Sequence, residues 1–87
     1  MPAIAEMDLA TLTADKVVDA RGAACPGPLL EAKKGMGAVP MGGVIEVWSS
    51  DPVTKSDIAA WANKVGHESL GHVEAEGYDR VFIRRGK

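Results

Sequence analysis

The chain has 87 residues, of which 46% are hydrophobic and 25% charged, and its formal net charge is −2 at pH 7. A chain of this length forms one domain with a thin core, which leaves little room for an enclosed active site. The charge argues against direct nucleic-acid binding, because domains built for that purpose are usually basic. No apolar run approaches the roughly 20 residues of a membrane span, so no membrane contact is expected.

Residues 1–16 show no strong periodicity and are expected to form a flexible arm before a domain over residues 17–87. The arm has no basic segment before an apolar stretch and carries Glu6, Asp8 and Asp15, so it is not expected to act as a signal peptide. A single cysteine excludes an internal disulfide bond. These features predict a reducing, cytoplasmic setting.

The first half of the domain predicts two strands with a helix between them. Residues 17–20 are typical of a short strand, and residues 21–24 of a loop. Residues 26–36 predict a helix, because proline suits the first turn and glycines stand near the end. The β-branched residues in the range 44–49 predict the second strand.

A second helix is predicted to begin at Thr54 and to stop at Gly66. Thr54 with Asp57 three residues later resembles a capping box. Apolar residues follow at the spacing of one helix face, and they are Ile58, Trp61, Ala62 and Val65.

Two more strands are predicted over residues 70–75 and 80–85, joined by a hairpin turn over residues 76–79. The element order is therefore βαβαββ. Elements this short favour an α+β fold, a two-layer sandwich in which two helices cover one face of a four-stranded mixed sheet.

Alternation along the second and fourth strands predicts which sheet face is buried. The aliphatic residues that share one face are Ile45, Val47, Val81 and Ile83. If that face packs against the helices, Trp48 and Phe82 lie on the open face. These two aromatic residues either form a partner surface or are covered by the N-terminal arm, and both interpretations stay open.

Cys25 stands at the predicted N-cap of the first helix. Pro26 and Pro28 stiffen the entry and have no N–H, so only Gly27 among the next three residues can donate to the sulfur. A helix N-terminus favours an anion and lowers a thiol pKa by a few tenths to about one and a half units. Such a thiolate can attack the persulfide of a donor and keep its outer sulfur. Gly27 adds no side chain, which leaves room for a large partner.

Positive charge near this thiol has three candidate sources, Arg21, Lys33 and Lys34. The alternative interpretation of Cys25 is a small buried hydrophobic residue, which is the usual fate of a lone cysteine. The flanking prolines favour the N-cap, because a buried core cysteine has no need of a stiff frame.

Residues 19–28, Asp-Ala-Arg-Gly-Ala-Ala-Cys-Pro-Gly-Pro, resemble the D-x-x-G-x-x-C-P-x-P signature of the TusA/SirA-like small sulfurtransferases. Residues 51–57 resemble the D-P-x-T-x-x-D stretch that precedes the second helix in that family. The resemblance covers nearly all of residues 17–87. It implies a βαβαββ sandwich like the C-terminal domain of translation initiation factor three.

The resemblance also implies a sulfur carrier with sulfurtransferase activity, in which Cys25 accepts sulfane sulfur as a persulfide and relays it to an acceptor protein. The implied donor is a cysteine desulfurase or a rhodanese-type protein, and no cofactor is expected. Members of the family serve tRNA thiolation, molybdenum-cofactor assembly or sulfur oxidation. The supporting motif positions are Asp19, Gly22, Pro26, Gly27, Pro28, Asp51 and Asp57. We interpret Asp51 and Asp57 as helix caps.

Some members carry a second cysteine in the second helix, where this chain has Trp61 and Ala62. Its absence excludes a dithiol relay within the chain. The rival hypothesis is a non-catalytic regulatory or interaction module with a structural or redox-sensing cysteine. Formation of a sulfur adduct on Cys25 would discriminate between the two.

Two other groups of residues receive simpler interpretations. His67 and His72 match no standard zinc spacing with Cys25, so they are interpreted as surface residues and no metal site is expected. Basic residues near the C-terminus either contact an acidic partner or RNA, or form a solvated strand edge and tail, which is the preferred interpretation. They are Arg80, Arg84, Arg85 and Lys87.

Overall fold

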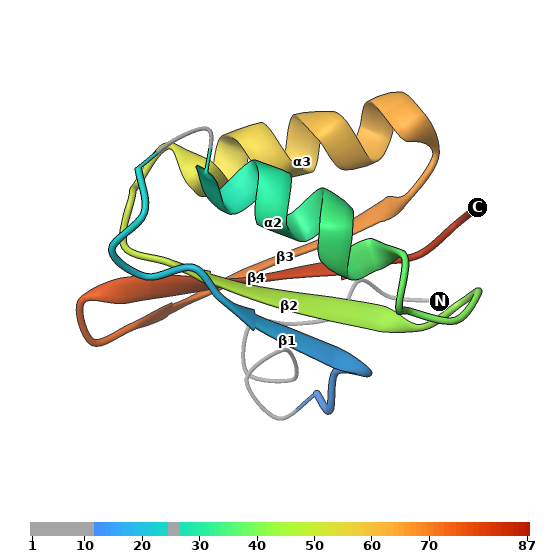
Figure 1. Ribbon diagram of the computed structural model, residues 1–87, viewed down its shortest axis with the longest axis horizontal. Helices are drawn as coiled ribbons and strands as arrows, with labels where there is room; N and C mark the ends of the chain where they lie inside the picture. Colours follow the sequence, from blue (N-terminus) through green and yellow to red (C-terminus); the bar gives the residue numbers. More distant parts are fainter. Residues whose placement is uncertain (1–11, 25–26) are drawn as a thin grey trace.

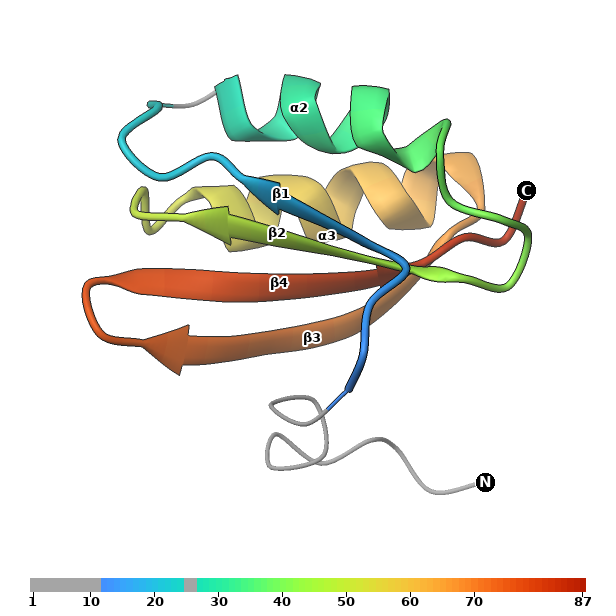
Figure 2. The same ribbon diagram turned by 60° about the horizontal axis from the view of Figure 1, so that its bottom comes forward.

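The computed structural model describes residues 12–24 and 27–87. Its elements are β1 (Lys16–Asp19), α2 (Gly27–Met36), β2 (Val44–Ser49), α3 (Thr54–Val65), β3 (Glu68–Ala75) and β4 (Tyr78–Arg84). The strands form one sheet in the order β1-β2-β4-β3, with β1 parallel to β2 and β4 antiparallel to both of its neighbours. Both helices cover the same face of this sheet (Figures 1 and 2). The predicted βαβαββ two-layer sandwich is therefore confirmed.

The strand boundaries differ from the predicted ones mainly at the hairpin. β2 spans the predicted residues, whereas β3 and β4 both begin two residues earlier than expected. Ala75 pairs with Tyr78, so the turn between the two strands holds only Glu76 and Gly77. The predicted four-residue turn is wrong because Tyr78 and Asp79 are already part of the ladder.

Helix α3 begins and ends where the sequence predicts, but its start is built differently. The N-cap position is Val53, which makes no side-chain cap hydrogen bond. Thr54 is buried, and its hydroxyl lies 2.9 Å from the hydroxyl of Ser49. The predicted capping box is therefore wrong, since the threonine joins the helix to the end of β2.

The main core lies between the sheet and the two helices. Its buried residues are Ala20, Ala32, Met36, Val39, Ile45, Val47, Ile58, Ala62, Val81 and Ile83. All four aliphatic residues predicted to share a sheet face are among them, which confirms that this face packs against the helices. Within the described residues, neither helix is long and apolar enough to cross a membrane.

A second, smaller cluster lies on the opposite face of the sheet. Phe82 is fully buried there with Val44 and Val73, and the described part of the arm packs against it through Leu12 and Ala14. Figure 2 shows the chain before β1 reaching this side. The described part of the arm therefore helps to bury Phe82, whereas Trp48 is only partly buried.

The three arginines of the basic cluster near the C-terminus each bind a specific partner. Arg80 forms an ion pair with Glu46 at 2.7 Å, and Arg84 forms one with Glu68 at 3.1 Å. Arg85 donates to the main-chain carbonyl of Val39 at 2.6 Å. The predicted solvated strand edge is wrong, because β4 lies between β2 and β3.

Candidate functional site

The candidate site is the end of the molecule at the left of Figure 1, called here the loop end. It comprises the loops over residues 20–24 and 49–53 and the hairpin turn over residues 76–77. The carboxyl ends of β1 and β2 meet the N-terminal ends of both helices there (Figure 1). Cys25 and Pro26 lie outside the described residues, between the first loop and α2.

The loop over residues 20–24 is held by four consecutive main-chain N–H groups. These bonds run from Ala20 to the Trp48 carbonyl (2.9 Å), from Arg21 to Asp19 Oδ1 (3.2 Å), from Gly22 to Ser50 Oγ (3.0 Å) and from Ala23 to the Ala20 carbonyl (3.2 Å). Hydrogen-bonded loop residues have fewer conformations available to them. The segment leading to Cys25 is therefore ordered up to the residues just before it.

Gly22 explains why the motif has glycine at this position. Its φ is +88°, in the left-handed region that residues with a side chain rarely adopt. In this conformation its N–H reaches the hydroxyl of Ser50. Sequence reasoning missed Ser50 as part of the site. A signal was present, since β1 and β2 were predicted to flank a helix, and loops after parallel neighbours meet at one edge.

Asp19 and Arg21 form a two-bond ion pair beside this loop. Arg21 Nε lies 2.9 Å from Asp19 Oδ1, and Nη2 lies 2.7 Å from Oδ2. The side-chain hydrogen bond from Arg21, followed by its main-chain hydrogen bond, lowers the pKa of Asp19 to about 2. The guanidinium also stacks on two rings, 4.9 Å from the centroids of both Trp48 and Tyr78. Arg21 is thus engaged by a carboxylate and by two aromatic rings.

The start of α2 packs tightly against the loop before it. The Gly27 N–H donates to the carbonyl of Ala24 at 2.8 Å, so the group expected to donate to the Cys25 sulfur is already engaged. A Cβ at Gly27 would lie 3.2 Å from the Cβ of Ala23, a tight contact. Glycine therefore allows the loop to approach the helix, a role that the sequence did not suggest. Pro28 is fully buried.

Electrostatics at this helix start come mainly from the main chain. The first turn of α2 has no acidic residue, so no carboxylate offsets the positive end of the helix dipole from that turn. Lys33 and Lys34 lie in the last turn, about 9 Å or more along the axis from Gly27. Lys34 pairs with Glu31 at 3.8 Å. The structure does not bring these two lysines to the helix start.

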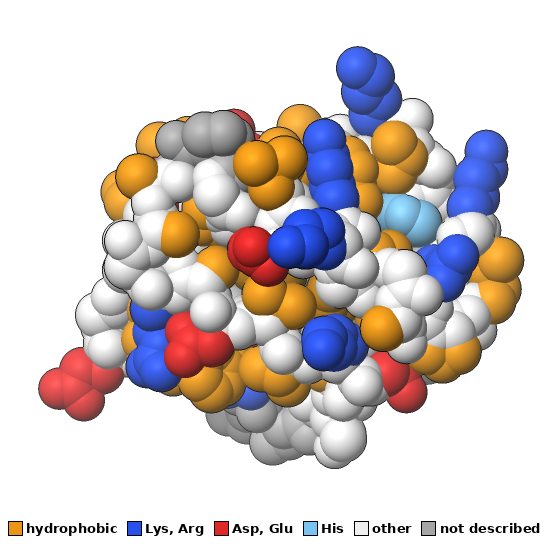
Figure 3. All heavy atoms as spheres, in the orientation of Figure 1, with side chains coloured by type: hydrophobic (Ala, Val, Ile, Leu, Met, Phe, Trp, Pro, Cys, Tyr) orange, Lys and Arg blue, Asp and Glu red, His pale blue; other side chains and the backbone are white. Residues whose placement is uncertain are grey.

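The surface around the helix start differs from the rest of this face. In Figure 3, hydrophobic and uncharged atoms predominate at the upper left, over the start of α2, whereas lysine and arginine side chains gather farther along the helices. Leu30 and Val53 are among the exposed large hydrophobic residues, at 51% and 53% exposure.

The two motif aspartates lie at the start of α3. Asp51 Oδ1 accepts the N–H of Val53 at 3.0 Å, and its carbonyl accepts the N–H of Thr54 at 3.1 Å. Asp57 lies in the first turn of the helix, where the helix dipole stabilises a negative charge. Both residues are therefore placed to support the turn that enters α3.

The histidines lie away from the loop end. His67 follows α3, and its Nδ1 accepts the N–H of Gly86 at 3.0 Å. Burial, with Arg85 and Lys87 nearby, lowers the pKa of His67. His72 lies in the middle of β3. Both are partly buried. Within the described residues, no group of three His, Cys, Asp or Glu could hold a metal ion.

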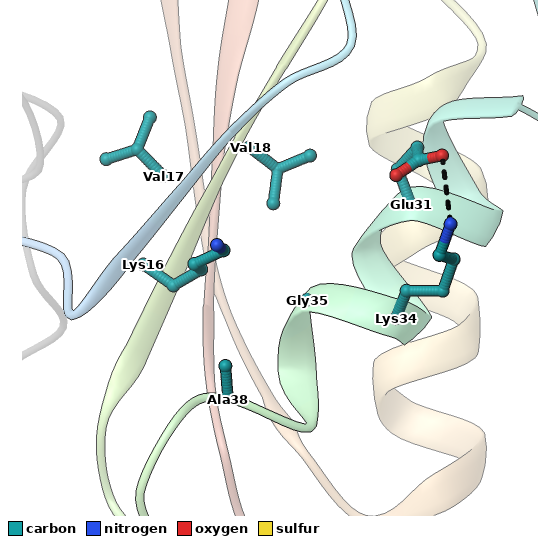
Figure 4. Close-up of a pocket in the computed structure, with 7 residues that line it drawn as sticks. All are labelled: Lys16, Val17, Val18, Glu31, Lys34, Gly35 and Ala38. Carbon is teal, nitrogen blue, oxygen red and sulfur yellow. Dashed lines mark ion pairs between the residues drawn. The ribbon is translucent and has the colours of Figure 1, made fainter.

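Two hollows on the surface are shallow and open to solvent. One hollow has a volume of about 310 Å³ and runs between β1 and the second half of α2, where Glu31, Lys34 and Gly35 face Lys16 and Val18 (Figure 4). A hollow of about 210 Å³ lies at the loop end between the 50–52 segment and the hairpin. The loop end is therefore an exposed surface.

Comparisons with known proteins all point to one family. The family profile described as Sulfurtransferase TusA matches residues 16–85. A protein from Archaeoglobus fulgidus that is named as a sulfur carrier is 45% identical over 69 residues, which are 79% of this chain and 94% of the relative. The sulfur carrier protein TusA of Pseudomonas entomophila is 37% identical over 71 residues, 82% of this chain and 89% of the relative.

A solved structure gives the same result. The crystal structure of a SirA-like protein from Desulfitobacterium hafniense superposes with a TM-score of 0.72 and 27% sequence identity. The match covers 83% of this chain and 99% of that protein.

Proposed function

Because this chain belongs to the sulfurtransferase TusA family of sulfur carriers, we propose that it carries the sulfur on Cys25 as a persulfide. Cys25 is the only cysteine in the chain, so no other thiol can bear the sulfur. The observation that carries the proposal is the loop before it, in which the four N–H groups from Ala20 to Ala23 all donate hydrogen bonds. An ordered entry to an exposed helix start suits a thiol that must meet other proteins.

The proposed reaction is a transfer of one sulfur atom. The Cys25 thiolate attacks the outer sulfur of a donor persulfide, R–S–SH. A bond forms between Cys25 Sγ and that sulfur, the donor's S–S bond breaks, and the donor leaves as the thiolate R–S⁻. The product, Cys25–S–SH, passes its outer sulfur to an acceptor nucleophile in the same way, which regenerates the Cys25 thiolate.

The start of α2 supports formation of this thiolate without a neighbouring base. His67 accepts the N–H of Gly86 near the C-terminus and His72 lies in β3, and we propose that neither takes the proton. The helix dipole favours a negative charge at its N-terminus, and no acidic residue in the first turn opposes it. We therefore expect the pKa of Cys25 to lie below the ordinary value of about 8.5.

The partners follow from the exposure of the site. A family of sulfur carriers works in a sulfur relay, so one protein must supply the sulfur and another must receive it. We propose a cysteine desulfurase or a rhodanese-type protein as the donor. The hollows at the surface are shallow and none encloses a substrate within the described residues, so the acceptor must present its own reactive group at the loop end.

Sulfur loading tests this proposal directly. Incubation of the protein with polysulfide should add about 32 Da for each sulfur atom, as measured by mass spectrometry of the intact protein. Cys25→Ser should add nothing, and thermal unfolding of both forms controls for folding. If the wild-type protein stays unmodified under conditions that load another sulfur carrier, Cys25 is a structural or redox-sensing residue and the proposal is wrong.

A further inference from the structure

We propose that Arg21 is a positioning residue, whose guanidinium fastens the loop over residues 20–24 to the sheet and so holds the chain that enters Cys25. The inference rests on the proposed function of Cys25 as the sulfur-bearing thiol. Arg21 stands four residues before Cys25, inside the hydrogen-bonded loop.

The contacts of Arg21 reach three strands at once. Its two side-chain bonds go to Asp19, the last residue of β1. Its guanidinium lies 4.9 Å from the ring centroids of Trp48 in β2 and Tyr78 in β4. The two rings are themselves in contact, with centroids 5.5 Å apart. Arg21 therefore ties the loop to β2 and β4 as well as to its own strand.

The Trp48 and Tyr78 rings, which contact Arg21, are themselves positioned by neighbouring residues. Trp48 Nε1 donates a short hydrogen bond to Glu46 Oε2. Glu46 is buried, and its Oε2 also accepts from Arg80 Nε at 2.7 Å. Tyr78 is part of the β3–β4 ladder, where it pairs with Ala75. A stacked arginine gains most from a ring that does not move, because less side-chain entropy is lost on contact.

The arrangement indicates that Arg21 acts by position and not by its charge. Asp19 pairs with the guanidinium through two bonds, so most of its positive potential is compensated. Planarity is essential to both the paired bonds and the stacking, and lysine supplies neither. Arg21→Lys therefore keeps the charge while losing the fastening, which separates the two possible roles.

The experiment compares Arg21→Met and Arg21→Lys with Arg84→Met. Arg84 is a matched control, because it forms a similarly exposed ion pair with Glu68 away from the loop end. The rate of Cys25 alkylation by iodoacetamide is measured against pH, which reports the thiol pKa. Amide hydrogen exchange at Gly22 and Ala23 reports the order of the loop.

In both Arg21 variants we expect iodoacetamide to alkylate Cys25 roughly two- to fivefold more slowly at neutral pH, with a raised thiol pKa. The reason is that a less ordered loop before Cys25 reduces the stabilisation of its thiolate by the helix dipole. Exchange at Gly22 and Ala23 should speed up in both, and Arg84→Met should match the wild type. If Arg21→Lys behaves as wild type while Arg21→Met does not, the residue acts by charge. If neither variant differs from the wild type in alkylation or exchange, Arg21 is a surface residue without a positioning role. Either result overturns the inference.

The same protein samples separate this inference from the proposed function. Wild-type protein that takes up sulfur from polysulfide, together with Arg21 variants of unchanged alkylation and exchange, overturns the positioning role alone. Wild-type protein that takes up no sulfur overturns the carrier function. The alkylation and exchange data then still decide whether Arg21 orders the loop, because neither depends on persulfide formation.

Discussion

The two ends of the molecule are tied together in different ways. The tail end, at the right of Figure 1, comprises residues 37–43, 66–67 and 85–87. Its bonds join segments far apart in the sequence: Gly42 N–H to the Arg85 carbonyl, Arg85 N–H to the Gly43 carbonyl, the Arg85 side chain to the Val39 carbonyl, and Gly86 N–H to His67 Nδ1. The loop end combines both kinds of bond: Ala20 N–H to the Trp48 carbonyl and Gly22 N–H to Ser50 Oγ are long-range, whereas Asp19 and Arg21 are two residues apart and Ala20 and Ala23 three.

This difference predicts that the two ends contribute differently to the stability of the fold and to the reactivity of Cys25. Bonds between distant segments close large loops of chain, and losing them loosens several elements at once. Local bonds shape a single loop and matter little to the rest of the fold. We therefore expect substitutions at the tail end to lower the free energy of unfolding, and substitutions at the loop end to change the behaviour of Cys25.

The largest effect on stability is expected for Arg85→Met. The guanidinium donates to the carbonyls of Val39 and Met36, at 2.6 and 3.3 Å, just beyond and at the end of α2. Losing a charged donor to part-buried carbonyls should lower the free energy of unfolding by about 1.5–3 kcal/mol, as measured by urea denaturation. Arg84→Met, next in sequence, should cost at most about 1 kcal/mol. Equal losses in the two variants would contradict the comparison.

A smaller effect on stability is expected for Ser50→Ala at the loop end. The hydroxyl accepts the N–H of Gly22 at 3.0 Å in an exposed position, so its loss should cost about 0.5–1.5 kcal/mol. Alkylation of Cys25 should nevertheless slow, because the loop before it loses an anchor. Ser56→Ala, an exposed serine in α3, serves as the control. A Ser50→Ala protein with normal alkylation would show that the loop needs no such anchor.

The smallest change in stability is expected when the pH is lowered, and it affects the tail end at a higher pH than the loop end. Folding lowers the pKa of His67 below 6.5, so the unfolded chain binds the proton more readily. The contribution of His67 to stability is full above pH 6.5 and declines as the pH falls below it towards the folded value. Urea denaturation of wild type and His67→Asn across this range measures the loss, and equal pH dependence would contradict it.

The loop end responds only at much lower pH. The pKa of Asp19 falls from 3.8 to about 2 on folding, so its contribution is present above pH 3.8 and is lost as the pH falls towards 2. Asp19→Asn should remove this acid-dependent step and leave the step due to His67 unchanged. Mild acid is therefore expected to weaken the tail end while the loop around Cys25 keeps its ion pair.

Much of the fold could be predicted from local patterns. Alternation of Ile45 and Val47 with Glu46 and Trp48 has the period of a strand, and it identified the face that packs on the helices. The apolar spacing that includes Ile58 and Ala62 identified α3 and its buried side. These predictions held because burial of apolar side chains on one face is decided within a single element.

The errors arose where a residue has a partner outside its own element. Thr54 was expected to cap α3, but its hydroxyl lies against Ser49 in β2. Arg80 and Arg84 were expected on a solvated strand edge, but β4 lies between β2 and β3, and they pair with Glu46 and Glu68. Local sequence patterns identify side chains that can form hydrogen bonds or pack, but they do not identify the distant residue that each side chain contacts.

The sequence by itself determined the element order, the buried sheet face and the motif around the single thiol, because each follows from residue spacing along one element. Only the tertiary structure decided that Ser50 meets Gly22 and that Arg21 stacks on Tyr78. The second contact requires β4 to lie next to β2, whereas chain order alone would also allow β3 there. Strand order depends on the packing of the whole sheet against its helices, and no local pattern contains that information.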